Sequence, residues 1–312
     1  MQRIPAVLLV PLTLAAGCKT DSGAPAAEPS AARSTPRGDS PAVAAKPPVA
    51  REDHVLLAVD WMEEGGTTTE VFAVMPAAGG FAQPVIADSA SSARFYERWL
   101  NPGHRYTVLR GGRTTGSLTI AENDAQGCMA LTAATRASVS ESGFHGSGLA
   151  TSAPIGRDSA IVDQAAGADL AAVTALLRRE LESTGESWSP DAEVKALLVA
   201  LPGGGAAVVG SAAIRDLGEE ADQRARAATF IIAERAADGS LQPAVTWKRA
   251  RGDQEAEDEQ FERRFVDAAD LDGDGTPEIV ARTAMTESWL YTIYKRGPGG
   301  WTEVYRGGGG GC

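Results

Sequence analysis

A ladder of acidic residues at 270–278 constrains this chain more than any other stretch of its sequence. Asp270, Asp272 and Asp274 alternate along the chain, and Glu278 follows four residues after Asp274. Carboxylates so close together repel one another unless a cation lies among them. The stretch therefore predicts a tight loop that gathers oxygen ligands around a metal ion.

Calcium is the cation that fits this loop best, because it accepts about six to eight oxygen ligands in irregular geometry. The aspartates occupy the first, third and fifth positions, Thr276 offers its backbone carbonyl at the seventh, and Glu278 closes the site. Gly273 and Gly275 permit the positive φ angles that a tight loop requires. An EF-hand needs a glutamate at the twelfth position, where this chain has Ala281, so we expect the loop to lead into a strand. The alternative is an Asp-Gly turn without a metal.

The pattern Asp-x-Asp-Gly-Asp-Gly-x-x-Glu, followed by an apolar strand, resembles the calcium loop of FG-GAP (integrin-type or VCBS-like) repeats. The resemblance covers about 30 residues, from Phe261 to Trp289. It implies a calcium site at Asp270, Asp272, Asp274, Thr276 and Glu278. Members of that family carry several such loops, one in each propeller blade, and the blades depend on their neighbours. We find a single copy, and therefore do not expect a complete propeller.

The N-terminus has the pattern of a bacterial export signal. Arg3 precedes an apolar run from Pro5 to Gly17, which is too short to span a bilayer as a helix. The run ends in Leu-Ala-Ala-Gly-Cys, which resembles a lipobox and implies lipidation at Cys18. The resemblance also implies the outer membrane, because Lys19 and not Asp follows the cysteine. The alternative is ordinary secretion after cleavage at an Ala-x-Ala-like site.

Residues 19–50 are rich in Ala, Pro and Ser and contain no aromatic residue, which predicts a disordered tether. We therefore divide the chain into five parts. These are a signal peptide (1–18), the tether (19–50), a small β-rich domain (51–140), a linker loop and helix (141–190), and an antiparallel β domain with the calcium loop (191–312).

Alternating apolar residues between Gly and Pro predict a mainly β (α+β) fold of antiparallel meander sheets. We expect strands at 54–60, 68–75, 81–87, 105–110, 117–121, 128–134, 194–201, 206–214, 227–234, 241–248, 261–268, 278–285, 289–295 and 301–305. Helices are predicted at 89–100, with Asp88 as a candidate N-cap, and at 165–183, with an apolar stripe for packing. Residues 138–160, rich in Ser and Gly, are predicted to form a loop or a domain boundary.

The net charge of −12 excludes the basic surface that nucleic-acid binding requires. The chain has three cysteines. With Cys18 acylated, Cys128 and Cys312 remain as an even pair, and we predict that they form a disulfide in an oxidising compartment. Two free thiols, or a tail cysteine that links two chains, are the alternatives.

The sequence shows no assembled catalytic motif. Its histidines, His54, His104 and His145, lack metal-ligand spacing, and Ser147 lacks the flanking glycines of a hydrolase elbow. Aromatic residues cluster near the C-terminus, and we expect them to form a β core in preference to a glycan-binding surface. They are Trp289, Tyr291, Tyr294, Trp301 and Tyr305.

The sequence thus favours a lipid-anchored binding or scaffold protein of the bacterial envelope, held in the outer membrane, with a structural calcium site. Its expected partner is an envelope protein or a glycan, besides the membrane that holds the lipid anchor. The alternative is an envelope hydrolase that acts on glycan or peptide, with catalytic carboxylates that one sequence does not reveal.

Overall fold

The computed structural model describes residues 52–61, 67–123, 131–139, 147–155, 160–215, 225–250, 260–285 and 288–310, all within one compact unit. The export signal, the tether, Cys18, Cys128, His145 and Cys312 lie outside these residues, so the lipidation and the disulfide stay predictions. Within the described part of the chain, no helix is long and apolar enough to cross a membrane.

Strands dominate the described residues, and two α-helices interrupt them. The elements are β1 (His54–Trp61), β2 (Thr67–Met75), α1 (Ser89–Trp99), β3 (Arg105–Arg110), β4 (Arg113–Asn123), β5 (Thr132–Val139), β6 (Gly148–Thr151), β7 (Val162–Gln164), α2 (Gly167–Glu182), β8 (Glu193–Ala200), a short 3₁₀ turn (Pro202–Gly204), β9 (Ala206–Arg215), β10 (Ala225–Arg235), β11 (Leu241–Ala250), β12 (Gln260–Ala269), β13 (Glu278–Met285), β14 (Trp289–Gly297) and β15 (Gly300–Gly307).

The first six strands close into an antiparallel barrel in the order β1-β2-β5-β4-β3-β6. Side chains alternate along β1, so that Val55 and Leu57 fill the barrel interior while Leu56 and Ala58 point outward into a second core. Both faces of β1 are therefore buried, which explains why its sequence reads as a nearly continuous apolar run.

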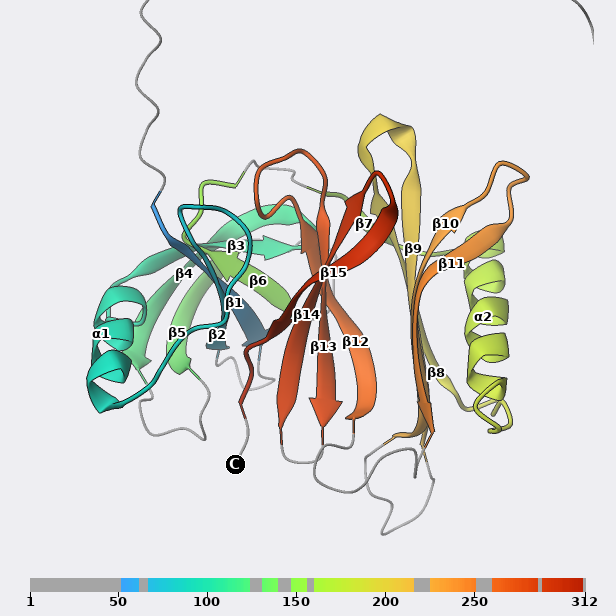
Figure 1. Ribbon diagram of the computed structural model, residues 1–312, viewed down its shortest axis with the longest axis horizontal. Helices are drawn as coiled ribbons and strands as arrows, with labels where there is room; N and C mark the ends of the chain where they lie inside the picture. Colours follow the sequence, from blue (N-terminus) through green and yellow to red (C-terminus); the bar gives the residue numbers. More distant parts are fainter. Residues whose placement is uncertain are drawn as a thin grey trace, which may run out of the picture. The chain divides into compact units, whose positions relative to one another are not determined.

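The four-stranded sheet β12-β13-β14-β15 lies between the barrel and the five-stranded sheet β11-β10-β9-β8-β7 (Figure 1). Val280 and Tyr291 pack against the outside of the barrel, and Ile279 and Ala281 pack against the five-stranded sheet. Successive side chains of β13 thus point to opposite faces of the sheet and pack into two different cores.

Helix α2 covers the opposite face of the five-stranded sheet (Figure 1). Val173 and Leu177 of the helix pack against Val208 and Ile231 of the sheet. Gly210 lies under the helix, where an added Cβ would approach Val173 Cγ2 to 2.7 Å, so the helix packs against bare backbone there.

The predicted fold class is confirmed for the described residues, since the chain is mainly β, with antiparallel meanders and two helices. Its sheets form a barrel and two open sheets, not a complete propeller. The capping role of Asp88 is also confirmed, because its side chain accepts a hydrogen bond from the Ser91 N–H. The division of 51–312 into three parts stays a prediction, although β6 of the barrel lies beyond residue 140.

Two local predictions are wrong. The stretch 81–87 forms only an isolated bridge at Ala82, and Val85 is 80 % exposed because no core covers it. The segment 138–160, predicted as a loop or a domain boundary, contains β6, which closes the barrel by pairing with β1 and β3. The four residues Gly-Leu-Ala-Thr are all buried, so they lack the polar alternation by which a strand is recognised.

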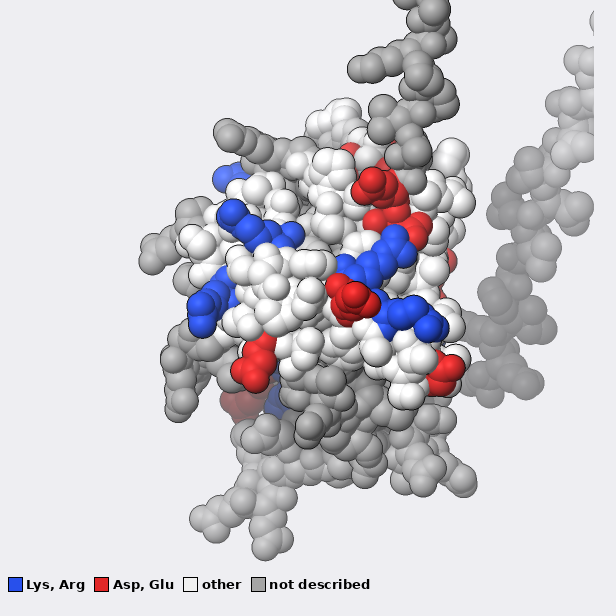
Figure 2. All heavy atoms as spheres, turned by 90° about the vertical axis from the view of Figure 1, so that its left-hand side faces the viewer, with Lys and Arg blue, Asp and Glu red and all other residues white. Residues whose placement is uncertain are grey.

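Other strands differ from their expected bounds by a few residues. The strand expected at 117–121 corresponds to the longer β4, and the strand expected at 128–134 corresponds to β5, which begins at Thr132. On the face that Figure 2 shows, basic and acidic side chains are interspersed without a continuous basic area.

Buried carboxylates join the barrel to the four-stranded sheet. Glu70 of β2 accepts hydrogen bonds on Oε2 from Trp289 Nε1 at 2.7 Å and from the Tyr291 hydroxyl at 3.1 Å. Asp267 of β12 is fully buried, and its Oδ1 accepts from the backbone N–H of Gly112, in the β3–β4 turn, at 2.9 Å. Burial raises the pKa of Asp267 to about 7, although backbone donors and nearby Arg110 lower it.

Because Asp267 is buried, the free energy of unfolding should depend on pH. In the folded protein its carboxyl group keeps its proton up to about pH 7, whereas the ordinary pKa of this group is 3.8. Its stabilising contribution is therefore complete below the ordinary pKa and decreases as pH rises through about 7. The Asp267→Asn variant stays neutral, so its stability relative to the wild type should increase with pH by at most about 1.4 kcal/mol per unit. Urea unfolding between pH 4 and 7.5 measures this difference.

The exposed Asp238 provides a matched control, because Asp238→Asn removes a carboxylate that lies in a turn. Parallel stability curves for the wild type and Asp267→Asn would contradict the assignment.

Candidate metal centre

The loop between β12 and β13 curls around the carboxylate of Asp270. Its Oδ1 accepts a hydrogen bond from Gly273 N–H at 2.9 Å, and its Oδ2 accepts one from Gly275 N–H at 3.0 Å. Asp274 Oδ1 accepts from Thr276 N–H at 2.9 Å. Gly273 and Gly275 have φ values of 78° and 88°, as the sequence predicts. The loop is thus a defined turn that side-chain oxygens hold together.

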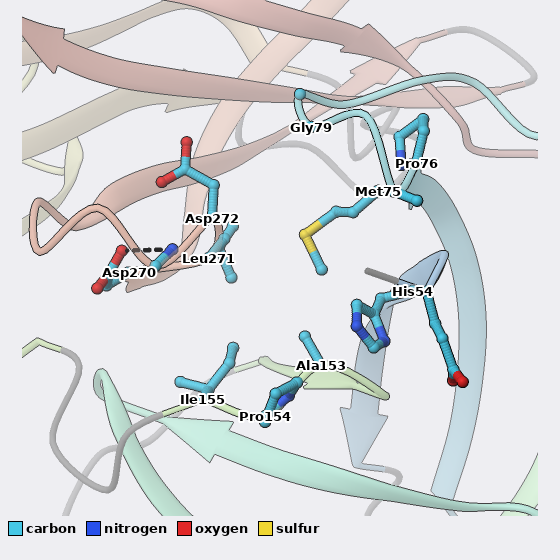
Figure 3. A pocket seen from close by; sticks show the side chains of 14 residues that line it. His54, Met75, Pro76, Gly79, Ala153, Pro154, Ile155, Asp270, Leu271 and Asp272 are labelled. Atoms are coloured by element: carbon cyan, nitrogen blue, oxygen red, sulfur yellow. Dashed lines mark hydrogen bonds between the residues drawn. The ribbon is translucent and has the colours of Figure 1, made fainter. Parts of the chain in front are cut away.

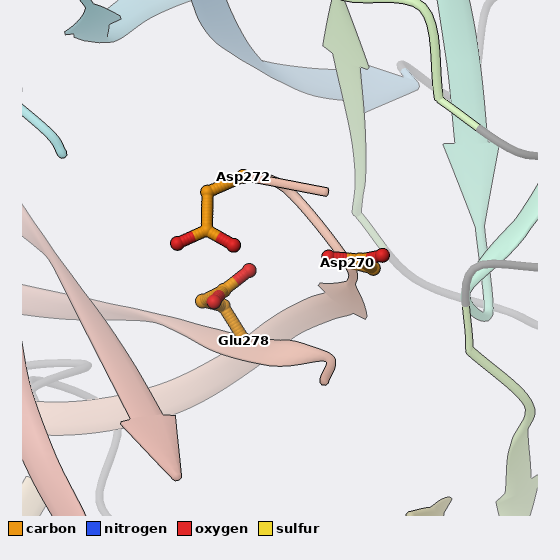
Figure 4. A group of neighbouring side chains, drawn as sticks. All are labelled: Asp270, Asp272 and Glu278. Atoms are coloured by element: carbon orange, nitrogen blue, oxygen red, sulfur yellow. The ribbon is translucent and has the colours of Figure 1, made fainter. Parts of the chain in front are cut away.

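Three carboxylates converge in this loop. Asp270, Asp272 and Glu278 each offer one oxygen, and these oxygens lie within 4.8 Å of one another. Figure 4 shows the carboxylates of Asp272 and Glu278 facing each other, with Asp270 beside them. Glu278 opens β13 and is fully buried, and its Oε2 accepts a hydrogen bond from Leu271 N–H at 2.8 Å.

A lysine that the sequence analysis missed reaches into the same cluster. Lys295 Nζ lies 2.8 Å from Asp274 Oδ2 and 3.3 Å from Glu278 Oε1, and it also pairs with Asp272. Its position follows from the register of β13 and β14, in which Ile279 pairs with Tyr294 and so brings Lys295 beside Glu278. The expected strands at 278–285 and 289–295, paired as an antiparallel hairpin, contained the signal for this neighbour.

Burial and charge together set the protonation of these groups. Burial, with a smaller effect from the charge of Asp272, raises the pKa of Glu278 to about 7 against the opposing effects of Leu271 N–H and Lys295. The hydrogen bond from Lys295 lowers the pKa of Asp274 below its usual value. Desolvation lowers the pKa of Lys295, but its bonds with Asp272 and Asp274 outweigh that effect and raise the pKa.

The residues present fit a divalent cation. Glu278 Oε1 is buried and lacks a hydrogen-bond partner among the described residues, so its charge is balanced only by the nearby ammonium group. Hard divalent cations prefer carboxylate oxygens as ligands, and Glu278 Oε1 is an oxygen of this kind. Of the predicted ligands, Asp270, Asp272 and Glu278 come together, and Lys295 links Asp274 to them. Thr276 is half-buried at the end of the loop, and its role as a carbonyl ligand stays a prediction.

A cavity of about 560 Å³ lies beside this loop. Asp270, Leu271 and Asp272 form one side, His54 lies on the opposite side, and Met75 points into the space between them (Figure 3). The turn after β2 and the segment after β6 complete the walls. The further lining residues are Glu52, Pro76, Ala77, Gly79, Gly80, Ala153, Pro154, Ile155 and Gly273.

The histidine in this cavity has a serine neighbour. Ser152 Oγ lies 3.4 Å from His54 Nδ1 and accepts a hydrogen bond from Val55 N–H at 3.1 Å. The adjacent Asp53 is bonded to Ala77 N–H and to Arg98, each at 3.0 Å. The carboxylate that would orient the imidazole in a serine hydrolase is therefore directed elsewhere.

Other sequence candidates have structural roles. Ser147 donates its hydroxyl to Asp60 Oδ1 at 3.0 Å, as expected of a loop residue. The clustered aromatic residues form a core, as predicted, since Tyr291, Tyr294, Trp301 and Tyr305 are all buried. Trp289 is half-buried against Glu70.

Comparison with protein-family models, with curated proteins and with solved structures gives no match to this chain. The assignment of the loop therefore depends on its own geometry and on its sequence pattern.

The position of Lys295 predicts competition between its ammonium group and a bound cation. In Lys295→Met the carboxylates of Asp272, Asp274 and Glu278 lose this counter-charge, so the metal-free protein should be less stable. Calcium should bind about tenfold more tightly, equivalent to about 1.4 kcal/mol, because no ammonium group has to leave the oxygens. Titration calorimetry at constant ionic strength measures the affinity.

Lys248→Met is the matched control, since Lys248 pairs with Glu180 away from the loop. Calcium affinity that is unchanged or weaker in Lys295→Met would refute the competition.

Proposed function

We propose that this chain is a calcium-stabilised binding protein, lipid-anchored in the outer membrane of a bacterial envelope. One observation carries the binding role: the loop that gathers three carboxylates also forms one wall of the 560 Å³ cavity. Cavities of roughly 300–1,000 Å³ with apolar walls and a few polar groups are typical ligand sites. The anchoring and the location are supported by the sequence of the N-terminus alone.

Calcium would have a structural role at this site. Asp270, Asp272 and Glu278 would hold it, with Asp274 as a further ligand once Lys295 releases its oxygens. The ion would supply the positive charge that the crowded carboxylates lack. The single FG-GAP-like motif supports calcium over other divalent ions. Extracellular calcium modules bind at roughly 0.1–1 mM, which suits a structural ion outside the cell.

The cavity favours a protein partner over a glycan. Met75, Ile155 and Leu271 give it an apolar lining, and the described lining residues include no Phe, Tyr or Trp on which a sugar ring would stack. An apolar side chain from a segment of an envelope protein fits such walls. Because Leu271 and Asp272 line the cavity, an ion that fixes the loop would also fix one wall of the binding site.

A hydrolase of the envelope is the second candidate. The contact between Ser152 and His54 favours it, since apo catalytic hydrogen bonds are often long. The pairing of Asp53 with Arg98 argues against it. If the wild type hydrolyses peptide or glycan substrates and the Ser152→Ala variant does not, the hydrolase function would replace the binding role.

The calcium site predicts a stability change that depends on its ligands. Calcium at about 1 mM should stabilise the wild type by about 0.4–1.4 kcal/mol, because an ion of this affinity binds the folded state alone. The double variant Asp272→Ala/Asp274→Ala should lose most of this gain, because two of the carboxylates are gone. Thermal melts in calcium and in chelator give the two shifts. The double variant Glu97→Ala/Asp238→Ala removes the same charge from exposed positions on helix α1 and in the β10–β11 turn, and it should keep the full gain.

An equal calcium-induced shift in the wild type and in Asp272→Ala/Asp274→Ala would remove the metal from the proposal.

The lipid anchor predicts that Cys18→Ser releases the protein from the membrane, because acylation of that thiol is then impossible. Fractionation of cells into membrane and soluble pools measures the change. Cys128→Ser, which leaves the lipobox-like sequence intact, should stay in the membrane pool. Membrane fractionation that persists in Cys18→Ser would contradict lipidation at this residue.

A further inference from the structure

Another cavity, of about 540 Å³, lies where the three sheets meet. Three basic residues line it, each from a different strand: Lys195 from β8, Arg264 from β12 and Arg282 from β13. No acidic residue is among its described lining residues. This is unexpected in a chain with a net charge of −12, and it contrasts with the cavity beside the metal loop, where the charged lining residues are acidic.

The remaining lining suits an organic molecule. The hydroxyl groups of Ser147 and Ser211 and the side-chain amide of Gln164 supply neutral polar groups. Leu197 and Phe265 are among the apolar residues of the wall. The cavity therefore combines hydrogen-bond donors with an apolar surface, in a volume that suits a small ligand.

The carboxylates that pair with these basic groups lie behind them, outside the cavity lining. Glu193 is 3.3 Å from Lys195 Nζ and 3.6 Å from Arg264 Nη2, and Glu262 is 2.5 Å from Arg264 Nε. Their ion pairs hold the basic heads in place. They do not fill the cavity, because neither glutamate is part of its lining.

Arg282 is the least satisfied of the three basic residues. Its closest ion pair, with Asp60 Oδ2, measures 3.8 Å, and its Nε is buried without a hydrogen-bond partner among the described residues. The guanidinium group packs over the Trp289 ring at 4.8 Å from the ring centroid, which fixes its orientation. Glu70 is the other acid nearby, and its carboxylate accepts hydrogen bonds from Trp289 Nε1 and from the Tyr291 hydroxyl.

We propose that this cavity binds a small organic anion, with a carboxylate or phosphate group on Arg264, Arg282 and Lys195 and an apolar body against Leu197 and Phe265. Arginine forks bind carboxylate and phosphate oxygens in pairs. The site is separate from loop 270–278, so its occupancy does not depend on calcium.

Titration calorimetry of the full chain, in chelator and at low salt, tests the site. The probes share a benzene ring and differ in the charge of the group attached to it. Phenyl phosphate and benzoate are the anions, benzyl alcohol is neutral and benzylamine is cationic. We expect binding of at least one anion, which 0.5 M NaCl weakens, and no binding of the other two probes. Binding of benzylamine or benzyl alcohol as tight as that of the anions would overturn the proposal, and so would the absence of anion binding.

Variants locate the binding in this cavity. Arg282→Gln should weaken the binding of the anion at least tenfold, and Lys195→Gln, at a more exposed position, serves if Arg282→Gln does not fold. Arg306→Gln is the matched control, because Arg306 pairs with Glu303 on β15 outside the cavity and should leave affinity unchanged. Equal affinity in the wild type and in the folded cavity variant, or an equal loss in Arg306→Gln, would refute the site.

Discussion

Burial of the four-stranded sheet on both faces is the constraint on which the rest of the structure depends. Its strands must supply apolar side chains to the barrel on one side and to the five-stranded sheet on the other, as Ile279 and Val280 do in adjacent positions. A sheet buried in this way fixes its own hairpin register, since a slip of one residue would exchange the two faces. That register also determines where the β12–β13 loop and both cavities lie.

Charged groups lie close to this buried sheet, and each has a specific compensation. Asp267 is held by backbone donors and by the proton that burial retains, and Glu70 is held by Trp289 and Tyr291. Glu278 has the ammonium group of Lys295 within 3.3 Å. A buried carboxylate with only one such neighbour is open to further stabilisation, which is the physical basis for placing a divalent cation at the loop.

The two cavities differ in chemistry for the same structural reason. Each is lined by residues from more than one sheet or connecting loop, and those residues decide its charge. Asp270 and Asp272 make one cavity acidic where it meets the β12–β13 loop, whereas Arg264 and Arg282 make the other basic. An acidic chain thus carries two cavities whose charged lining residues have opposite signs.

The sequence by itself determined the features that short-range patterns encode. The alternation of apolar residues predicted most strands of the two meanders, the stripe of apolar residues predicted α2, and the spacing of Asp270, Asp272 and Asp274 predicted a curled loop with positive φ at Gly273. Each of these depends on neighbours within about ten residues, whose geometry the backbone dictates.

Only the tertiary structure decided what distant segments do to one another. It placed Lys295 among the carboxylates, used the four residues of β6 to close the barrel, and brought Lys195, Arg264 and Arg282 around one cavity. Strand register and the packing of separate sheets set these contacts, because they bring together residues far apart in the chain. A single sequence contains no local pattern from which such contacts follow.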